Sequence, residues 1–347
     1  MKKYIILLII ILFPLRVNAT STTLMDMDTN RVLYNSNGND VRLIASISKI
    51  MTAIVTINNY DISNVIKIDE SVLKSYGSGI YVEVGEEISV ENLLYGLMLR
   101  SGNDAAIQIA NTVGGSMENF VKMMNDTAKS IGMKNTNFIN SSGLENDKGE
   151  GNTSTSYDMA LLMSYAMKNE VFKKIVSTQK KVVKTNYKTY VWYNKNKLLK
   201  NYKFCTGGKT GFTEKARRTL VTTASKDNMN FVVVTLNDPN DFSDHLNLYE
   251  EYFKKYKSYK VLDSKDKFSN EKYYIKNDKY VALTQDEFKS IKKEVVYYDN
   301  NVSDIVGFIN IKLNDKLLAK EYIYEKKETV KKKKKMNFME KIKKLFD

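Results

Sequence analysis

Apolar residues recur along this chain at two spacings, which separate helical from extended segments. Residues 23–26 and 31–34 flank a polar stretch and predict a β-hairpin. Helical spacing predicts helices over residues 44–57, 90–99, 105–113, 117–131, 157–167 and 241–256. Strands are predicted over residues 181–186, 189–193, 219–224 and 231–236. Strands at both sequence ends predict an antiparallel sheet faced by helices, in which the first hairpin pairs with the last strands.

The pattern changes near residue 260. Polar and apolar residues alternate over residues 279–283, 294–298, 307–313 and 317–324, and Asn314-Asp315 supplies a hairpin turn. We therefore predict a small β-rich domain over residues 260–325. The tail, residues 326–347, holds ten lysines against three acidic residues. Its apolar residues share one helical face, which suits an anionic membrane surface, although a solvated tail is the alternative.

The first residues have the pattern of an export signal. Lys2 and Lys3 precede a largely apolar run that ends at Leu15, and small residues near Ala19 suit cleavage. The run is too short for a comfortable membrane-spanning helix. We predict a signal peptide over residues 1–19, with an uncleaved N-terminal anchor as the alternative.

Charge and metal-ligand content narrow the function. The net charge of +14 falls to +11 without residues 1–19, and the tail holds +7 of the remainder. A nucleic-acid-binding surface would spread its charge differently, so we expect no nucleic-acid partner. Cys205 is the single cysteine and His245 the single histidine, which excludes an intramolecular disulfide and gives little support to a metal site. We expect no metal and no cofactor.

Three short motifs carry the candidate chemistry: Ser46-Ile47-Ser48-Lys49, Ser101-Gly102-Asn103 and Lys209-Thr210-Gly211. S-x-x-K recurs in this lysine-rich chain, but Ser46 opens a strongly apolar helix and has Lys49 one turn along on its own face. A serine hydroxyl becomes a nucleophile when a nearby base takes its proton. Burial and a second cation, which we expect to be Lys209, would lower the pKa of Lys49 enough for that task.

The other two motifs would complete the site. The Ser101 hydroxyl can relay a proton, and the Asn103 amide can hold a substrate amide. Lys209 and Thr210 can bind a carboxylate, while Gly211 lets a ligand lie against a strand. Each motif alone also fits a helix cap, a turn or a solvated lysine. Their joint occurrence in this order favours a serine–lysine enzyme.

With these motifs the chain resembles the low-molecular-mass penicillin-binding proteins, the serine D-alanyl-D-alanine carboxypeptidases. Residues 24–34, 45–53, 97–106, 138–144, 153–159 and 207–211 match the family's pattern, within a likeness that spans about residues 23–253. Residues 215–220 and 237–253 look closest to a sporulation-type subgroup of Gram-positive bacteria. The resemblance implies an α+β fold over residues 20–259, like that of penicillin-binding proteins and β-lactamases. That fold has an antiparallel sheet with helices on both faces and a helical subdomain, and the β-rich domain and membrane-anchoring tail follow it.

The resemblance also implies roles for individual residues. Ser46 would be acylated with Lys49 as general base, and Ser101 and Asn103 would form the second active-site element. The terminal carboxylate would lie on Lys209 and Thr210 beside Gly211, and the backbone N–H groups of Ser46 and Phe212 would form the oxyanion hole. The implied substrate is a peptidoglycan pentapeptide ending in D-Ala-D-Ala, and the implied inhibitors are β-lactams. The implied location is the outer face of the cell membrane or the cell wall.

Two departures from the family's pattern bear on substrate binding. Ser142-Gly143-Leu144 stands where many members read H-G-L, and Asp241 stands where many carry an arginine before F-x-D. Lys209 would then act alone, or with Arg217 or Arg218.

Two other functions stay open, a serine β-lactamase and a non-catalytic wall- or membrane-binding protein on the same fold. The E-x-x-L-N loop of one major β-lactamase class is absent from the sequence. Peptide transfer and cleavage of branched cross-links, as additional activities, stay open too.

Overall fold

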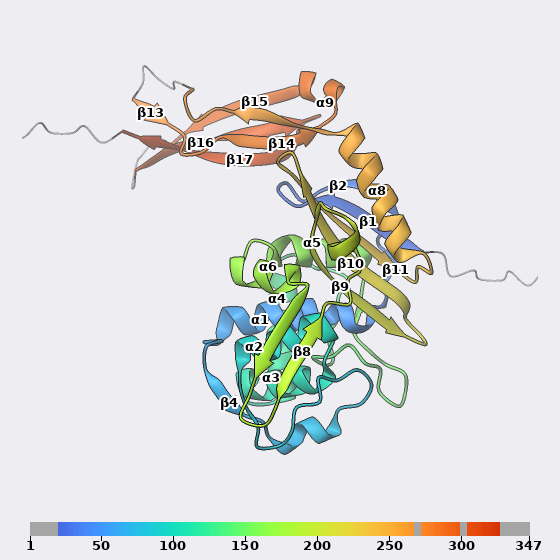
Figure 1. Ribbon diagram of the computed structural model, residues 1–347. Helices are drawn as coiled ribbons and strands as arrows, with labels where there is room; N and C mark the ends of the chain where they lie inside the picture. Colours follow the sequence, from blue (N-terminus) through green and yellow to red (C-terminus); the bar gives the residue numbers. More distant parts are fainter. Residues whose placement is uncertain (1–19, 267–271, 299–303, 327–347) are drawn as a thin grey trace, which may run out of the picture. The chain divides into compact units, whose positions relative to one another are not determined.

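The computed structural model describes residues 20–266, 272–298 and 304–326. The chain forms two compact units, the first ending at Ser258 and the second beginning at Tyr259 (Figure 1). The predicted signal peptide over residues 1–19 lies outside the described residues, as does the predicted tail beyond residue 326. No helix within the three described ranges is long and apolar enough to cross a lipid bilayer.

A five-stranded antiparallel sheet with the strand order β2-β1-β11-β10-β9 is the frame of the first unit. Its strands are β1 Ser21–Asp26, β2 Arg31–Ser36, β9 Cys205–Thr213, β10 Arg217–Lys226 and β11 Met229–Leu236. Leu24 of β1 lies opposite Val233 of β11, so the first hairpin pairs with a strand from the far end of the unit, as the sequence predicts. β9 is an edge strand of this sheet.

Helices cover both faces of the sheet and form a helical subdomain beside it (Figure 1). The helical elements are η1 Ala45–Ser48, α1 Lys49–Asn59, η2 Glu70–Lys74, α2 Val90–Tyr95, η3 Gly96–Arg100, α3 Asn103–Gly114, α4 Met117–Ser130, α5 Ser156–Ala166, α6 Glu170–Ser177, α7 Leu198–Asn201 and α8 Asp241–Lys255. The remaining strands of this unit are β3 Arg42–Leu43, β4 Val65–Lys67, β5 Glu87–Ser89, β6 Thr153–Ser154, β7 Lys180–Lys184 and β8 Thr189–Tyr193.

The side chains of β11 alternate between the two faces, as a strand buried on both sides requires. Val232 and Val234 join the large apolar core of the helical subdomain. Phe231 points to the other face and stacks on Phe253 of α8 with ring centroids 4.8 Å apart. His245 is also in α8, fully buried, with its ring nitrogens 2.7 and 3.1 Å from two threonine hydroxyls of the sheet. The only histidine therefore packs α8 onto the sheet, outside the candidate site. The α+β fold class is confirmed.

The second unit is β-rich, as predicted. β12 Lys257–Leu262 leads into it, and β13 Tyr273–Tyr274, β14 Lys279–Leu283, α9 Gln285–Lys289, β15 Ile291–Tyr297, β16 Ile305–Leu313 and β17 Lys316–Glu325 follow. Its main sheet has the order β13-β17-β16-β15. Asn314 and Asp315 connect β16 to β17 with φ of 49° and 61°, the left-handed pair that a two-residue hairpin turn needs.

Candidate active site

Ser46 and Lys49 are in direct contact at the start of the central helix. Ser46 lies in η1, a 3₁₀ turn, and Lys49 is the first residue of α1. A 3₁₀ turn has three residues per turn, so side chains three positions apart line up along it. Lys49 Nζ accordingly lies 3.1 Å from Ser46 Oγ. The sequence predicts an α-helical turn here, and the structure makes the same pair with a tighter one.

The amine of Lys49 is fully buried and has two further oxygen neighbours. Its Nζ lies 2.7 Å from Asn103 Oδ1 and 2.6 Å from the Ser142 carbonyl oxygen. Burial, with a smaller contribution from the positive charge of Lys195, lowers the pKa of Lys49 to about 7, against the opposing effect of Asp104. A neutral amine has two N–H groups and one lone pair. With both N–H groups donated to these oxygens, the lone pair faces the Ser46 hydroxyl.

Asn103 is placed to orient Lys49. It is buried, and its Nδ2 donates to the Tyr76 carbonyl oxygen at 2.6 Å while its Oδ1 accepts from Lys49. Both polar ends of this amide are therefore bound within the protein, and Asn103 is not among the residues that line the pocket described below. This differs from the expectation that its side chain holds a substrate amide.

Ser142-Gly143-Leu144, the first departure from the family's pattern, contacts Lys49 through the backbone carbonyl of Ser142. This contact does not depend on which side chain stands at position 142. The turn that presents this carbonyl depends on Gly143. Its φ is +85°, and a Cβ atom there would lie 2.0 Å from the Ala45 carbonyl oxygen. Only glycine allows the two segments to approach so closely.

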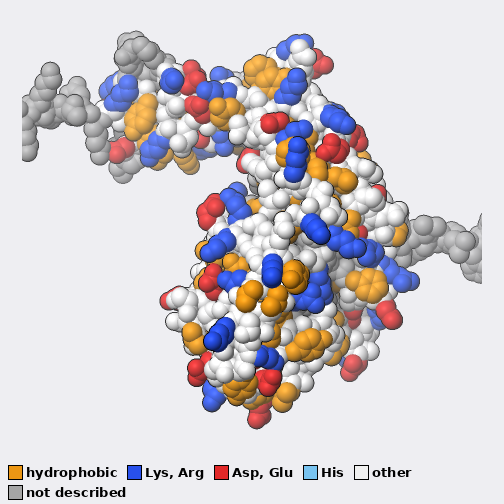
Figure 2. All heavy atoms as spheres, viewed as in Figure 1, with side chains coloured by type: hydrophobic (Ala, Val, Ile, Leu, Met, Phe, Trp, Pro, Cys, Tyr) orange, Lys and Arg blue, Asp and Glu red, His pale blue; other side chains and the backbone are white. Residues whose placement is uncertain are grey.

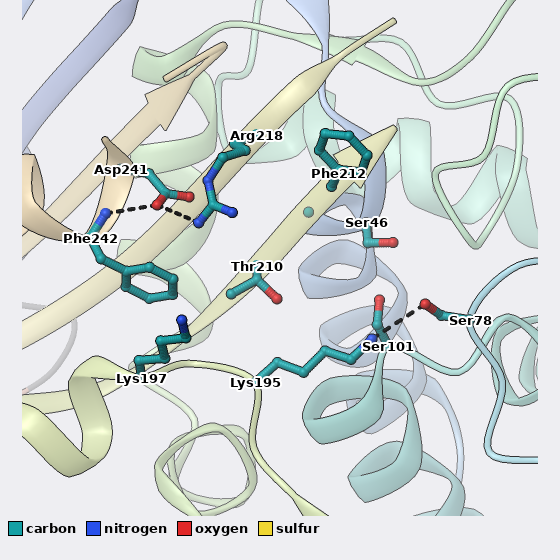
Figure 3. A pocket seen from close by; sticks show the side chains of 11 residues that line it. Ser46, Ser78, Ser101, Lys195, Lys197, Thr210, Phe212, Arg218, Asp241 and Phe242 are labelled. Atoms are coloured by element: carbon teal, nitrogen blue, oxygen red, sulfur yellow. Dashed lines mark hydrogen bonds and ion pairs between the residues drawn. The ribbon is translucent and has the colours of Figure 1, made fainter. Parts of the chain in front are cut away.

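A cavity of about 380 Å³ opens beside Ser46 (Figure 3). The predicted residues that line it are Ser46, Ser101, Thr210, Gly211 and Phe212. Ser101 is buried and has a left-handed backbone with φ of 66° and ψ of 37°, a strained conformation for a residue other than glycine. A Cβ atom at Gly211 would lie 3.0 Å from Ser46 N. Glycine thus lets the edge strand β9 lie directly against the turn that carries Ser46.

Lys209 lies behind this wall of the pocket. It is buried and its Nζ donates to the Thr210 carbonyl oxygen at 2.6 Å. Burial lowers the pKa of Lys209 well below its usual range, and the charges of Lys49 and Lys195 add to this. Lys209 and Lys49 therefore act on one another, because each buried ammonium disfavours the charge of the other. The positive charge of Lys195 also lowers the pKa of Lys49.

Three cations line the pocket itself, Lys195, Lys197 and Arg218. The Arg218 guanidinium donates to Asp241 Oδ1 at 2.7 Å, and the Asp241 carboxylate is buried (Figure 3). Asp241 occupies the position where the resemblance leads us to expect an arginine. Arg218 reaches the same pocket from the neighbouring strand, whereas Arg217 lines a separate cavity.

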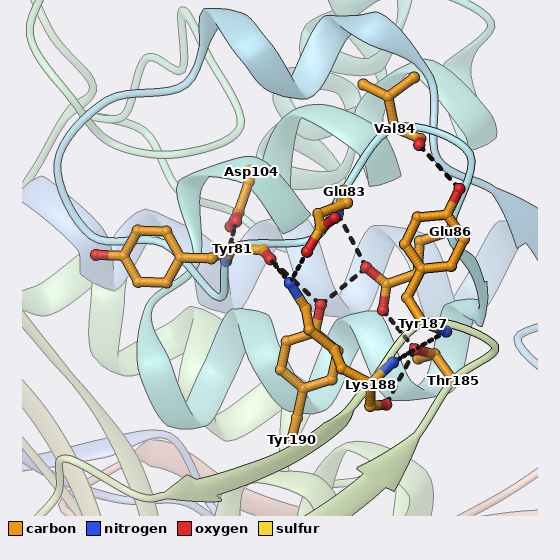
Figure 4. Close-up of polar contacts among 9 residues, drawn as sticks. All are labelled: Tyr81, Glu83, Val84, Glu86, Asp104, Thr185, Tyr187, Lys188 and Tyr190. Carbon is orange, nitrogen blue, oxygen red and sulfur yellow. Dashed lines mark hydrogen bonds and ion pairs between the residues drawn. The ribbon is translucent and has the colours of Figure 1, made fainter.

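The loop that carries Ser78 is held to α3 and to the β7–β8 hairpin (Figure 4). The Asp104 carboxylate accepts from the backbone N–H groups of Ile80 and Tyr81 at 3.0 and 2.6 Å. The carboxylate of Glu86, fully buried, accepts from the hydroxyls of Thr185 at 2.6 Å and Tyr190 at 2.8 Å. This loop also supplies Tyr76, which fixes the amide of Asn103. The loop is therefore part of the framework that positions Lys49.

Four pocket residues are missed by sequence reasoning: Ser78, Lys195, Lys197 and Phe242. Phe242 is the first residue of the F-x-D pattern, whereas Ser78, Lys195 and Lys197 belong to no motif. Asn194-Lys195-Asn196-Lys197 has the composition of any polar linker in this lysine-rich chain. Lys195 reaches the pocket because the end of β8 leads there, and its Nζ lies 3.3 Å from Ser78 Oγ. The sequence holds no signal that would have identified Ser78, Lys195 or Lys197.

Comparison with known proteins gives matches over most of the chain. Residues 12–240 match the family described as D-alanyl-D-alanine carboxypeptidase. D-alanyl-D-alanine carboxypeptidase DacF of Bacillus subtilis (strain 168) is 31% identical over 89% of this chain and 85% of its own. D-alanyl-D-alanine endopeptidase of Escherichia coli (strain K12) is 33% identical over 58% of this chain and 65% of its own. The crystal structure of D-alanyl-D-alanine carboxypeptidase from Mycobacterium tuberculosis H37Rv has a TM-score of 0.64 and 27% identity, and covers 67% of this chain and 90% of its own.

Proposed function

The chain belongs to the D-alanyl-D-alanine carboxypeptidase family of serine-type hydrolases, and on this premise we propose that it removes the terminal D-alanine from peptidoglycan stem peptides through an acyl-enzyme on Ser46. The contact that carries the proposal is the one between Lys49 Nζ and Ser46 Oγ, 3.1 Å long and closed off from water on the lysine side. An amine with a pKa near 7 is a competent base at neutral pH, where an ordinary lysine is almost entirely protonated.

Acylation then follows from the contacts around Ser46. As the Ser46 oxygen attacks the carbonyl carbon of the penultimate D-alanine, its proton passes to Lys49. Hydrogen bonds from the backbone N–H groups of Ser46 and Phe212 stabilise the negative charge on the carbonyl oxygen. The Ser101 hydroxyl relays the proton to the amine of the leaving D-alanine, and the C–N bond breaks. Water hydrolyses the ester, which returns a proton to the Ser46 oxygen and releases the shortened peptide.

The terminal carboxylate of the substrate would be received on the side of the pocket nearest Thr210. The Thr210 hydroxyl and the guanidinium of Arg218 supply hydrogen bonds there, and Lys195 and Lys197 supply positive charge. An incoming carboxylate also favours protonation of Lys209 behind this wall, because an opposite charge raises the pKa of a buried lysine. β-Lactams present a similar amide beside a carboxylate, so they should acylate the same serine.

The direct test labels the full-length chain with a fluorescent penicillin and follows release of D-alanine from a pentapeptide ending in D-Ala-D-Ala. We expect a stable adduct on the wild type, no adduct on Ser46→Ala, and D-alanine released by the wild type alone. Normal labelling of Ser46→Ala would refute the assignment. Rapid hydrolysis of the penicillin with no action on the peptide would identify a β-lactamase, and a folded wild type inert to both would identify a binding protein.

We also propose that the protein is exported and held at the outer face of the cell membrane. The support is the charged and apolar pattern of residues 1–19 and the basic amphipathic pattern of residues 326–347. Fractionation of cells that express the full chain or a chain ending at residue 325 tests this. We expect the full chain in the membrane fraction and the shortened chain in the extracytoplasmic soluble fraction; both in the cytoplasm would contradict it.

A further inference from the structure

Glu145 places a carboxylate without an ion-pair partner at the end of the catalytic strand β9. It directly follows Ser142-Gly143-Leu144, the segment that contacts Lys49, and its side chain is half-buried. Glu145 Oε1 accepts a hydrogen bond from Thr213 Oγ1 at 2.5 Å, and Thr213 is the last residue of β9. Among the residues that the structure describes, Glu145 forms no ion pair and its Oε2 accepts no hydrogen bond.

The backbone around Glu145 is held in place from two sides. The Tyr76 hydroxyl donates to the Glu145 carbonyl oxygen at 2.6 Å. The Asn140 side chain accepts from Gly143 N at 2.7 Å and donates to the Leu144 carbonyl oxygen at 2.8 Å, which fixes the turn that leads to Glu145. The carboxylate is therefore positioned before a ligand arrives, which reduces the entropy that binding must cost.

The charges around the pocket are mostly positive. Lysine and arginine side chains gather around β9 and β10 on the face of the first unit that Figure 2 shows. Lys195, Lys197 and Arg218 line the pocket, and Asp241, which lines it with them, is paired with Arg218. The carboxylate of Glu145 has no such internal partner, so the ligand group that fits it is a cation that donates hydrogen bonds.

The proposed reaction determines which part of the substrate lies near Glu145. The terminal carboxylate lies near Thr210 and the oxyanion at the N–H group of Phe212, which follow one another along β9 opposite Ser46 (Figure 3). The earlier residues of the peptide therefore continue along β9 toward Thr213. Extended chains advance about 3.3 Å per residue, so the residue before the two terminal D-alanines lies beside Thr213 and within reach of Glu145.

We propose that Glu145 binds the side-chain ammonium of the residue before the two terminal D-alanines, so that the enzyme selects stem peptides with a free amine at this position. This rests on the proposed function, because the same Ser46 reacts and the same strand holds the peptide. A diamino acid at this position supplies the ammonium. Its N–H groups can donate to Glu145 Oε2 while Oε1 stays bound to Thr213.

The first test compares three substrates on the full-length chain. They are pentapeptides that end in D-Ala-D-Ala and carry lysine, Nε-acetyllysine or norleucine immediately before these residues. The acetyl group and the hydrocarbon each remove the charge, and the loss of a hydrogen bond between charged groups lowers kcat/KM by about tenfold or more. We therefore expect the wild type to favour the lysine peptide over both others by at least about tenfold. Equal kcat/KM values on all three would overturn the inference.

Substitution of Glu145 separates recognition of the ammonium from a structural role. Glu145→Gln keeps an oxygen that can accept from Thr213 but removes the charge, so the ratio of kcat/KM for the lysine and acetyllysine peptides should fall to about one. Asp147→Asn is the matched control, because Asp147 is an exposed carboxylate of the same loop, without an ion pair in the described part of the chain. This control should keep the wild-type ratio. A Glu145→Gln variant that labels with penicillin and keeps the wild-type ratio would contradict the proposal.

Charge reversal gives a second, independent test. Glu145→Lys should prefer a pentapeptide with Nε-succinyllysine, which carries a carboxylate, over the lysine peptide, whereas the wild type should show the opposite order. The same order in both proteins would refute the role of Glu145. A wild type that binds penicillin and cleaves all the pentapeptides equally well would leave the proposed function standing and remove only this inference. A wild type that neither binds penicillin nor cleaves any of them would remove both.

Discussion

The buried amine of Lys49 predicts how the rate of acylation depends on pH. The base must be neutral to take the Ser46 proton, and burial together with Lys195 sets its pKa at about 7. Roughly one eleventh of such a group is neutral at pH 6, half at pH 7 and ten elevenths at pH 8. The acylation rate should therefore rise about tenfold from pH 6 to pH 8 and then level off.

Substitution of Lys195 adds a second, independent expectation. Removal of a nearby positive charge favours the ammonium form of Lys49, so Lys195→Ala should raise the pKa of Lys49 and move the midpoint of the profile to higher pH. Lys197→Ala is the matched control, since Lys197 lines the same pocket and is not among the charges that shift the pKa of Lys49. It should leave the midpoint where it is, whatever it does to the rate.

The assay is the second-order rate constant for labelling by a fluorescent penicillin, measured from pH 5.5 to pH 9.5 at constant ionic strength. A lysine with an ordinary pKa near 10.4 would give a roughly hundredfold rise from pH 6 to pH 8 and no plateau in this range. That profile, or a midpoint that stays fixed in Lys195→Ala, would refute the reasoning about Lys49.

Three further substitutions test other parts of the structure. Gly143→Ala should lower the free energy of unfolding, measured in urea, by at least about 2 kcal/mol and should slow penicillin labelling, because its Cβ would lie 2.0 Å from a carbonyl oxygen. Gly132 also has a positive φ but has open space around it. Gly132→Ala should therefore lower the free energy of unfolding only by the backbone strain of about 1–2 kcal/mol. Arg218→Ala should raise KM for the pentapeptide about tenfold through the loss of a charge-assisted hydrogen bond to its carboxylate, whereas Arg217→Ala should leave KM unchanged. Burial lowers the pKa of His245 to about 3 in the folded protein, whereas in the unfolded chain the residue is protonated below about pH 6.5. The free energy of unfolding should therefore fall by about 1.4 kcal/mol per pH unit as the pH is lowered from 6.5 to 3. Thermal unfolding of His245→Gln should show a shallower acid slope than the wild type, and parallel slopes would contradict this.

Much of the fold follows from spacing along the chain. The strands β10 and β11 and the helices α1 and α8 are long and strongly patterned, so the sequence predicts them. Helix α6 is missed because it has only eight residues, and three buried ones are too few to establish a period. β9 is predicted as a strand only through the Lys209-Thr210-Gly211 motif, because Gly207, Gly208 and Gly211 interrupt its β pattern. These glycines allow neighbouring segments to pack closely against β9, although the low strand propensity of glycine argues against a strand there.

The site residues also divide into those that can be predicted from local sequence and those that cannot. Ser46 and Lys49 can be paired from sequence because three residues separate them and local geometry alone brings them together. Lys195 and Ser78 arrive from a strand end and a loop, so their meeting depends on the whole fold. Motif reasoning for that reason misses Lys195, whose charge lowers the pKa of Lys49.

The consequence of having Asp241 where many relatives carry an arginine also depends on the three-dimensional fold. The position alone suggests the loss of a receptor for the substrate carboxylate. Packing of α8 on β10 brings Arg218 to Asp241 and returns a guanidinium to the pocket. Such compensation between strand and helix is invisible until the two are placed in space.

β9 leaves the five-stranded sheet unfinished on the side of Ser46, since its only neighbour within that sheet is β10. An extended ligand that lies along this edge would bind through backbone N–H and C=O groups, which every residue except proline offers regardless of its side chain. Recognition of this kind tests the shape and handedness of a backbone and is nearly indifferent to composition. An edge of this kind can therefore bind peptides whose individual side chains differ.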